Sequence, residues 1–187
     1  MALLEFRNAE YRLRDQTIVA CTNIMLAERA ALAHACDNAR AAATVGMMAA
    51  GIVRPTSGNV FVGAFDPRIQ PVQVKRMVGY VPHEALAPDF ESFTRYVEYR
   101  AALWALPRAE TIVRARALLA RLDGVHEAFA YPLVGALLSQ PALLVLDRPG
   151  AVYAEQILSI AGDCAVFSTH ESQREAERFA RALAVYR

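Results

Sequence analysis

The chain has 187 residues, of which 55% are hydrophobic and 21% charged, a length that suits one domain around one core. Its 20 basic and 19 acidic side chains are spread along the sequence, so neither a nucleic-acid-binding stripe nor an acidic tail is expected. No apolar stretch reaches the roughly 18 residues of a membrane span, and no signal-peptide pattern is present, so we expect a cytoplasmic protein without direct membrane insertion.

Three cysteines, Cys21, Cys36 and Cys164, stand far apart in the sequence. They lack the CxxC spacing of a zinc or redox site. We therefore expect no metal centre, and buried free thiols in a reducing compartment.

The order of apolar runs along the chain predicts an α/β fold with a largely parallel sheet. Short β-type runs alternate with helical patterns, and the first third is richer in strands. The runs LLVL and AVF are continuously apolar, as expected for inner strands of a sheet covered on both faces. The predicted strands are residues 3–6, 23–26, 30–33, 60–62, 78–81, 143–146, 165–167 and 182–186.

Two helices are predicted from apolar residues that recur every 3.6 positions. The first spans about residues 92–106 and ends before Pro107. The apolar face of the second consists of Ile112, Ala115, Leu118, Leu119 and Leu122. Because no internal repeat or linker divides the chain, residues 1–187 are predicted to form a single domain.

Four sequence strings occur in a fixed order: GIVRPTSG at 51–58, GYVPHE at 79–84, PALLVLDRP at 141–149 and FSTHE at 167–171. Together they resemble ABC-type ATPase subunits, particularly those that serve drug and polysaccharide exporters. The resemblance implies a P-loop NTPase-like ABC ATPase core with a mostly parallel sheet and an N-terminal antiparallel β part. It also implies a reduced helical subdomain at about residues 84–138.

The resemblance places the family's phosphate-binding loop, GxxxxGK[ST], at residues 36–44. That loop needs glycines whose backbone amides wrap the phosphates, a lysine for the β and γ phosphates, and a hydroxyl for Mg²⁺. Counting back from Gly51 puts Ala42 at the lysine position and Ala43 at the hydroxyl position, just before Thr44. A register two residues earlier puts Arg40 at the lysine position.

In neither register does this loop contain a glycine or a lysine. Alanine adopts left-handed backbone angles at a cost of about 1 kcal/mol or more, and its methyl group occupies space that a phosphate would need. We therefore expect an alanine-rich helix start rather than a phosphate site. Arg40 and the helix amino terminus leave anion binding as an alternative.

The family's remaining catalytic positions fall on four residues. Asp147 ends the LLVLD run and resembles the Mg²⁺-organising carboxylate, but Arg148 stands where the family has its catalytic glutamate. Arginine cannot act as a general base near neutral pH. His83 stands at the glutamine of the Q-loop and His170 at the switch histidine. The alternative is that these are ordinary residues at strand ends, without catalysis.

Two further family strings are absent from the sequence, the LSGGQ signature and the loop that follows the LLVLD strand. We interpret VGALLSQPALLVLD as running almost directly from a loop into the strand, with roughly a dozen residues deleted. ABC dimers bind ATP between the phosphate-binding loop of one subunit and the signature of the other, so the resemblance implies that this chain completes neither site.

A partner-binding surface is the candidate function for the segment that resembles the permease-docking part of the family. We expect a groove that receives a helix from a membrane partner, lined by His83, Glu84, Phe90, Phe93, Tyr96 and Tyr99. The alternative is that these aromatic rings belong to the core of the helical subdomain.

The sequence leads to one favoured function and two alternatives. The favoured function is a catalytically inactive ABC ATPase-like subunit, without a cofactor, in a membrane transport complex. Its expected partner is an ABC-type permease or another membrane-complex protein, which would hold it at the inner face of the membrane. Homodimers and heterodimers with an ABC ATPase stay open. The alternatives are a soluble pseudo-ATPase scaffold or homodimer unrelated to transport, and an unconventional nucleotide or anion binder.

Overall fold

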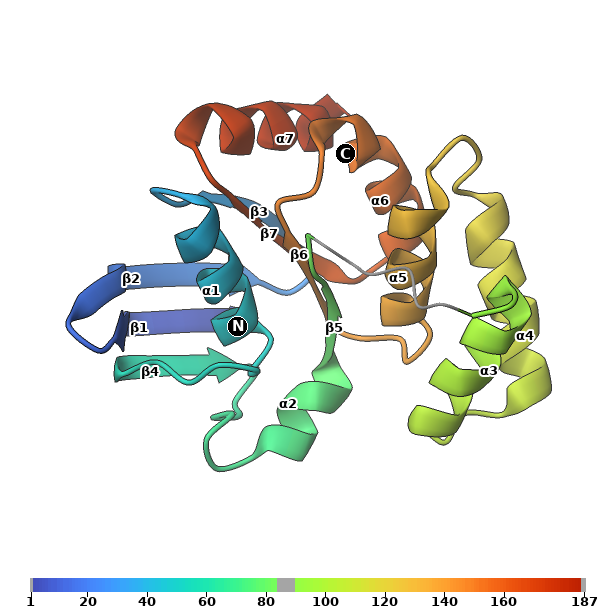
Figure 1. The fold of residues 1–187 in the computed structure, drawn as a ribbon, viewed down its shortest axis with the longest axis horizontal. Coiled ribbons are helices and arrows are strands. Elements are labelled where there is room, and N and C mark those ends of the chain that lie inside the picture. Colours follow the sequence, from blue (N-terminus) through green and yellow to red (C-terminus); the bar gives the residue numbers. More distant parts are fainter. Residues whose placement is uncertain (1, 84–89, 186–187) are drawn as a thin grey trace.

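The computed structural model describes residues 2–83 and 90–185, and it contains two sheets with helices packed around the larger one (Figure 1). The smaller sheet is antiparallel and has the order β2-β1-β4. Its strands are β1 (Ala2–Leu13), β2 (Gln16–Ala27) and β4 (Ser57–Val62). This confirms the predicted N-terminal antiparallel part and the strands predicted at 3–6, 23–26 and 60–62.

The larger sheet is parallel and has the order β3-β7-β6-β5. It consists of β3 (Ala31–Ala35), β5 (Val78–Val81), β6 (Leu143–Asp147) and β7 (Ala165–His170). All residues of the two inner strands, β6 and β7, are buried, as their continuously apolar runs predict. The α/β class with a mostly parallel sheet is therefore confirmed.

Alternate side chains of the inner strands point into two different cores. In β6, Leu143 and Val145 join the core that the parallel sheet shares with the antiparallel sheet and helix α1 (Ala39–Ala49). Leu144 and Leu146 face the opposite way, into the core formed with the other helices. This alternation follows from the two-residue period of a strand and explains why an uninterrupted apolar run is needed here.

The opposite face of the parallel sheet is covered by helices, as Figure 1 shows. Here α5 (Glu127–Leu137), α6 (Ala154–Ala161) and α7 (Gln173–Val185) contribute buried side chains. Beyond α5 lie α3 (Phe93–Leu103) and α4 (Arg108–Ala120), which confirm the two predicted helices. The short helices are α2 (Pro71–Met77) and the 3-10 helix η1 (Ala151–Tyr153).

Three expectations about local structure are wrong. The strand predicted at 182–186 is helical as far as Val185, because Ala176, Phe179 and Leu183 recur at helical spacing and bury one face of α7. Cys21 is exposed, since its side chain lies on the outer edge strand β2, whereas Cys36 and Cys164 are partly buried.

The third correction concerns the segment before β6, which does not run directly from a loop into the strand. Helix α5 fills this segment, with the side chain of His126 accepting a hydrogen bond from the backbone N–H of Ala128 at its start. The residues that lead into α5, DGVHE at 123–127, do not match LSGGQ.

Candidate functional site

The carboxyl ends of the four parallel strands lie at one edge of the larger sheet, where α/β folds bind their ligands. Asp147 ends β6 and His170 ends β7. Arg148 and His83 follow the ends of β6 and β5 and reach the same place. A hollow of about 530 Å³ at this edge is lined by His83, Arg148 and His170 together with η1 and the start of α7. The structure thus brings together the four catalytic-type positions named from the sequence.

The carboxylate of Asp147 is buried and fully engaged by its neighbours, with only 4% of its side chain exposed. Its Oδ1 accepts a hydrogen bond from Arg148 Nε at 2.9 Å and from the hydroxyl of Thr169 at 3.4 Å. Its Oδ2 accepts one from the backbone N–H of His83 at 3.4 Å. A carboxylate surrounded by donors in this way has little capacity left for an incoming metal ion.

Arg148 is held over Asp147 by contacts on several sides. Its backbone has a φ of +49°, an uncommon conformation for a residue with a side chain, and its N–H donates to the carbonyl of Thr169 at 2.9 Å. The guanidinium lies 3.8 Å from the carboxylate of Glu171, and its side chain is 19% exposed. His83 Nδ1 lies 3.2 Å from the Arg148 carbonyl oxygen. This arginine is therefore an internal counterion of the strand end.

His170 is buried beneath this pair of charges. Its Nε2 lies 2.9 Å from the hydroxyl oxygen of Ser168, and its ring packs against Phe179 with the ring centroids 5.1 Å apart. Burial lowers the pKa of His170 to about 4, although the nearby carboxylate of Asp147 acts in the opposite direction. The imidazole is thus neutral near pH 7 and behaves as a packed, hydrogen-bonded side chain.

Helix α1 begins within the segment that the resemblance assigns to the phosphate-binding loop. Only Cys36, Asp37 and Asn38 separate β3 from α1. Asn38 caps the helix, because its Oδ1 accepts a hydrogen bond from the N–H of Ala41 at 2.9 Å. None of residues 36–44 has a positive φ. The backbone therefore forms an ordinary capped helix start instead of an open loop around a phosphate.

The end of β3 favours the first of the two registers considered for this loop. The motif follows its strand, and Cys36 is the first residue after β3, whereas the second register would place the first glycine position at His34 inside the strand. In the first register the lysine position is Ala42, which is fully buried. Arg40, the lysine position of the second register, is exposed.

The hydroxyl of Thr44 is also engaged within the helix. Thr44 is 5% exposed, and its Oγ1 donates to the carbonyl of Arg40 at 2.8 Å. Ala43, at the hydroxyl position of the first register, has no polar side-chain atom. No side chain of residues 42–44 therefore offers a free donor or metal ligand.

The sequence analysis missed two residues that fasten α1 to this edge. Gly46 faces β6 and β7: a Cβ added there would lie 3.6 Å from Thr169 Oγ1 and 3.9 Å from Asp147 Cβ. Tyr80 packs beside it, and burial together with the Asp147 carboxylate raises the pKa of Tyr80 to about 12. A glycine inside a helical pattern is a sequence signal for such close packing.

The aromatic residues predicted to bind a partner divide into two groups. Tyr96 is 6% exposed and, with Phe93, packs against Tyr131 of α5, so these two rings contribute to the helical core. Phe90 and Tyr99 lie with ring centroids 5.3 Å apart and line an open surface hollow.

The two other predicted groove residues do not join the aromatic cluster in the structure. His83 lies at the sheet edge beside Arg148. Glu84 lies outside the described residues. The described part of the predicted partner surface is therefore the hollow beside Phe90 and Tyr99.

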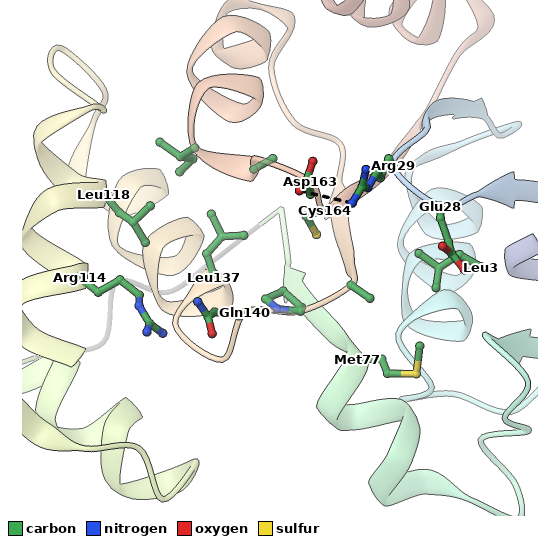
Figure 2. A pocket seen from close by; sticks show the side chains of 14 residues that line it. Leu3, Glu28, Arg29, Met77, Arg114, Leu118, Leu137, Gln140, Asp163 and Cys164 are labelled. Atoms are coloured by element: carbon green, nitrogen blue, oxygen red, sulfur yellow. Dashed lines mark ion pairs between the residues drawn. The ribbon is translucent and has the colours of Figure 1, made fainter. Parts of the chain in front are cut away.

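A larger hollow of about 570 Å³ lies at the opposite, amino-terminal edge of the parallel sheet (Figure 2). Both arginines that line it interact within the chain: Arg29 lies 3.6 Å from Asp163, and Arg114 Nη1 donates to the carbonyl of Leu138 at 3.1 Å. Pro141 and Ala142 of the PALLVLDRP string line it, but His83, Asp147, Arg148 and His170 do not. This hollow is thus separate from the candidate site.

The described residues contain neither a metal-binding cluster nor a membrane-spanning helix. Within residues 2–83 and 90–185, no group of three or more His, Cys, Asp or Glu side chains is placed to hold a metal ion. None of the described helices has both the length and the apolar character needed to cross a membrane.

No family model matches the chain, but a curated relative does. The Fe(3+) ions import ATP-binding protein FbpC of Escherichia coli (strain K12) is 23% identical over 158 residues, which cover 78% of this chain and 45% of that protein. The chain therefore spans less than half the length of this relative.

Solved structures of ABC ATPase domains share the fold over nearly the whole chain. An ATP binding subunit of an ABC transporter has a TM-score of 0.72 at 20% identity, over 95% of this chain and 82% of that one. The structure of cbiO1 from Clostridium perfringens, part of the ABC transporter complex cbiONQ, has a TM-score of 0.71 at 18% identity, over 90% of this chain and 78% of that one. The dimeric structure of the ATP-binding cassette MJ0796 with ADP and Pi has a TM-score of 0.73 at 14% identity, over 94% of this chain and 90% of that one.

These comparisons confirm the resemblance that the four sequence strings indicate. The chain has the ABC ATPase fold, and the curated relative supports its place in the ABC nucleotide-binding domain family. The likeness to exporter subunits stays a prediction, since the curated relative is named an import protein.

Proposed function

We propose that this chain is a catalytically inactive ABC ATPase-like subunit that serves as a structural or regulatory component of an ABC-type membrane transport complex. The observation that carries the proposal is the ion pair between Arg148 and Asp147. The guanidinium of Arg148 forms an ion pair with the Asp147 carboxylate, which resembles the family's Mg²⁺-organising group, with 2.9 Å between Nε and Oδ1. A positive charge at this position opposes a divalent cation and replaces the general base.

The start of α1 supports the same proposal independently. Phosphate binding needs backbone amides that are free to point at the ligand, together with a lysine. Here the side chain of Asn38 caps the helix and residues 41–44 carry no lysine. The residues present therefore do not fit Mg-ATP, and we derive no catalytic step from them.

The proposed partner follows from the transporters in which proteins of this fold are found. The curated relative is named an import ATP-binding protein, and cbiO1 is described as part of a transporter complex. We propose that a permease or another membrane-complex protein binds at the hollow beside Phe90 and Tyr99. Such a partner would hold the chain at the cytoplasmic face of the membrane.

A calorimetric titration of the purified chain with Mg-ATP and with ADP tests the proposed inactivity. We expect no saturable heat up to high micromolar nucleotide. Saturable binding of one nucleotide per chain would contradict the proposal and would favour the alternative of an anion or nucleotide binder around Arg40 and Arg148.

A restored loop provides a matched positive control. The variant Cys36→Gly/Ala41→Gly/Ala42→Lys/Ala43→Ser rebuilds GxxxxGKS in the register that the structure favours. We expect this variant, once combined with Arg148→Glu, to bind nucleotide, whereas Arg148→Glu alone should not. Circular dichroism melting establishes that each variant is folded before titration.

Co-purification with the permease tests the proposed partner surface. Because the exposed Tyr99 and the partly buried Phe90 line this surface hollow, Phe90→Ser/Tyr99→Ser should abolish co-purification and leave the fold intact. Val113→Ser is the matched control, since Val113 is an exposed apolar residue on α4 outside this hollow. Unchanged co-purification of the double variant would remove this surface from consideration.

A further inference from the structure

Helix α2 and the segments beside it form a corner of the molecule that carries three exposed large apolar side chains. Figure 1 shows α2 at the periphery of the molecule, beyond β4 and β5. Ile69 is 77% exposed, and Ile52 and Val72 are each 56% exposed. A single exposed aliphatic side chain is ordinary on a protein surface, but a group of them marks an interaction site.

Contacts within the chain bring the three side chains to the same corner. A Cβ added at Gly51 would lie 3.0 Å from the side chain of Val74 in α2, so the segment that contains Ile52 runs beside this helix. Ile69 lies in the turn that leads into α2, where its N–H donates to the carbonyl of Asp66 at 3.0 Å. Residues distant in sequence are therefore neighbours here.

Basic side chains flank the apolar residue on the outer face of α2. Val74 is fully buried and thus marks the inner face of this helix. With about 100° between successive helical residues, Val72 lies on the opposite face, between Lys75 and Arg76. All three are exposed, and neither basic side chain forms an ion pair with another described residue.

The net charge of this corner is positive. Residues 51–77 contain one acidic side chain and four basic ones, Arg54, Arg68, Lys75 and Arg76. The acidic residue, Asp66, is 8% exposed and forms an ion pair with Arg68 at 2.6 Å. Its charge is therefore neutralised within the chain, and the positive charges of Arg54, Lys75 and Arg76 remain at the surface.

This combination fits the surface of an anionic bilayer. Exposed aliphatic side chains enter the headgroup region, and the lysine and arginine side chains around them meet the lipid phosphates and carboxylates. An acidic protein would match the charges, but it would need a pocket for each apolar side chain. A bilayer accepts such side chains from a projecting corner without a matching shape.

From the exposed apolar side chains and the positive charge around them, we infer that the corner of residues 51–77 binds peripherally to an anionic lipid bilayer. The contact consists of Ile52, Ile69 and Val72 together with Arg54, Lys75 and Arg76. It lies apart from the hollow beside Phe90 and Tyr99, and it does not depend on the function proposed above.

Cosedimentation of the purified chain with sucrose-loaded vesicles tests this inference. We expect binding to phosphatidylcholine vesicles that contain about 30% phosphatidylserine, and at least tenfold weaker binding to pure phosphatidylcholine. Binding should also fall as the salt concentration rises, because salt screens the charges. A chain that does not sediment with the anionic vesicles at low salt overturns the inference.

Charge removal on α2 locates the contact. Lys75→Gln/Arg76→Gln should weaken binding to the anionic vesicles about thirtyfold, since two basic side chains are lost from the surface. Arg116→Gln/Arg121→Gln is the matched control, because it removes two exposed basic side chains at α4. An equal loss in the two double variants would place the contact elsewhere and overturn the inference.

Fluorescence tests whether the apolar side chains enter the bilayer. Trp104→Phe removes the single tryptophan of the chain, and Ile69→Trp then adds one at the corner. Its emission should shift to shorter wavelength with the anionic vesicles, whereas that of Val113→Trp, at an exposed position on α4, should not. Circular dichroism establishes that each variant is folded.

Two results of these measurements would point to another partner. Binding without a shift for Ile69→Trp would show a contact through charges alone. Binding to soluble polyglutamate as tight as binding to the vesicles would favour an acidic protein. Either result overturns the bilayer as the partner of this corner.

Discussion

At the end of β6, Asp147 stands where the resemblance places a carboxylate, whereas at the start of α1 residues 36–44 contain neither a glycine nor a lysine. The carboxylate of Asp147 forms an ion pair with the neighbouring Arg148. At the start of α1, the side chain of Asn38 caps the first turn of the helix. In both regions the polar groups at the sheet edge are bonded within the chain, the Asp147 carboxylate to Arg148 and the Asn38 side chain to the N–H of Ala41.

The largest expected effect concerns the buried ion pair at the end of β6. Asp147→Ala should lower the free energy of unfolding by about 3 kcal/mol, because it leaves the mostly buried Arg148 without its closest counterion. Urea denaturation measures this loss, and the exposed Asp37→Ala is the control. A loss as small as that of the control would mean that the pair contributes little and that the carboxylate is free for another role.

The next effect is a pH dependence of stability that comes from His170. Burial lowers its pKa to about 4 from the ordinary value of 6.5, so the unfolded chain binds the proton more readily than the folded one. Stability is therefore full above about pH 6.5 and is lost as the pH falls toward 4.

Unfolding of the wild type and of His170→Gln at both ends of this range tests the dependence. Between about pH 7 and pH 5 the wild type should lose roughly 1 to 2 kcal/mol. The pH slope of His170→Gln should be smaller but still present, because burial also lowers the pKa of His34. Equal slopes in the two proteins would rule out His170 as the titrating group.

A smaller effect is expected at the start of α1. Asn38→Ala removes the hydrogen bond to the N–H of Ala41 and should lower stability by about 1 kcal/mol. Asn38→Ser retains a capping oxygen and should stay close to the wild type. Thermal unfolding compares the three proteins, and equal melting temperatures would show that this region is not a capped helix start.

The smallest expected effect is a gain in stability from a substitution at Gly46, where α1 packs against the ends of β6 and β7. Gly46 lies inside α1, and an added Cβ would meet its nearest neighbours at 3.6 Å, which is an ordinary contact distance. Gly46→Ala should therefore stabilise the chain by about 0.5 to 1 kcal/mol. Gly46→Leu should instead be destabilising, as its larger side chain would meet Tyr80 and Thr169. A destabilised alanine variant would indicate tighter packing between α1 and β6.

Sequence reasoning succeeded where apolar periodicity is clear and failed where it is not. The bounds predicted for β5 agree with the structure, and β6 and β7 extend their predicted runs by a few residues. Helix α5 was missed because it is buried on most sides and contains Pro132, so it has no polar stripe to reveal a helical period. A short apolar run fits either a strand or a helix, which explains why a strand was wrongly predicted at residues 182–186, within the last turns of α7.

The sequence alone determined the kinds of residue at each position of the site. Residues 36–44 contain neither a glycine nor a lysine, and Arg148 stands where the resemblance predicts a glutamate. These are chemical properties of single positions, and no arrangement in space can supply a missing side chain. The order of the four strings was likewise enough to indicate the family, which the comparisons support.

The tertiary structure decided which groups meet and which stay open. His83 and Arg148 are 65 positions apart, yet they touch because parallel strands end at the same edge of the sheet. The bonding of Asp147 by its neighbours likewise depends on strand order, which is set by long-range packing. Periodicity in a sequence records which face of an element is buried, but not which other element covers it.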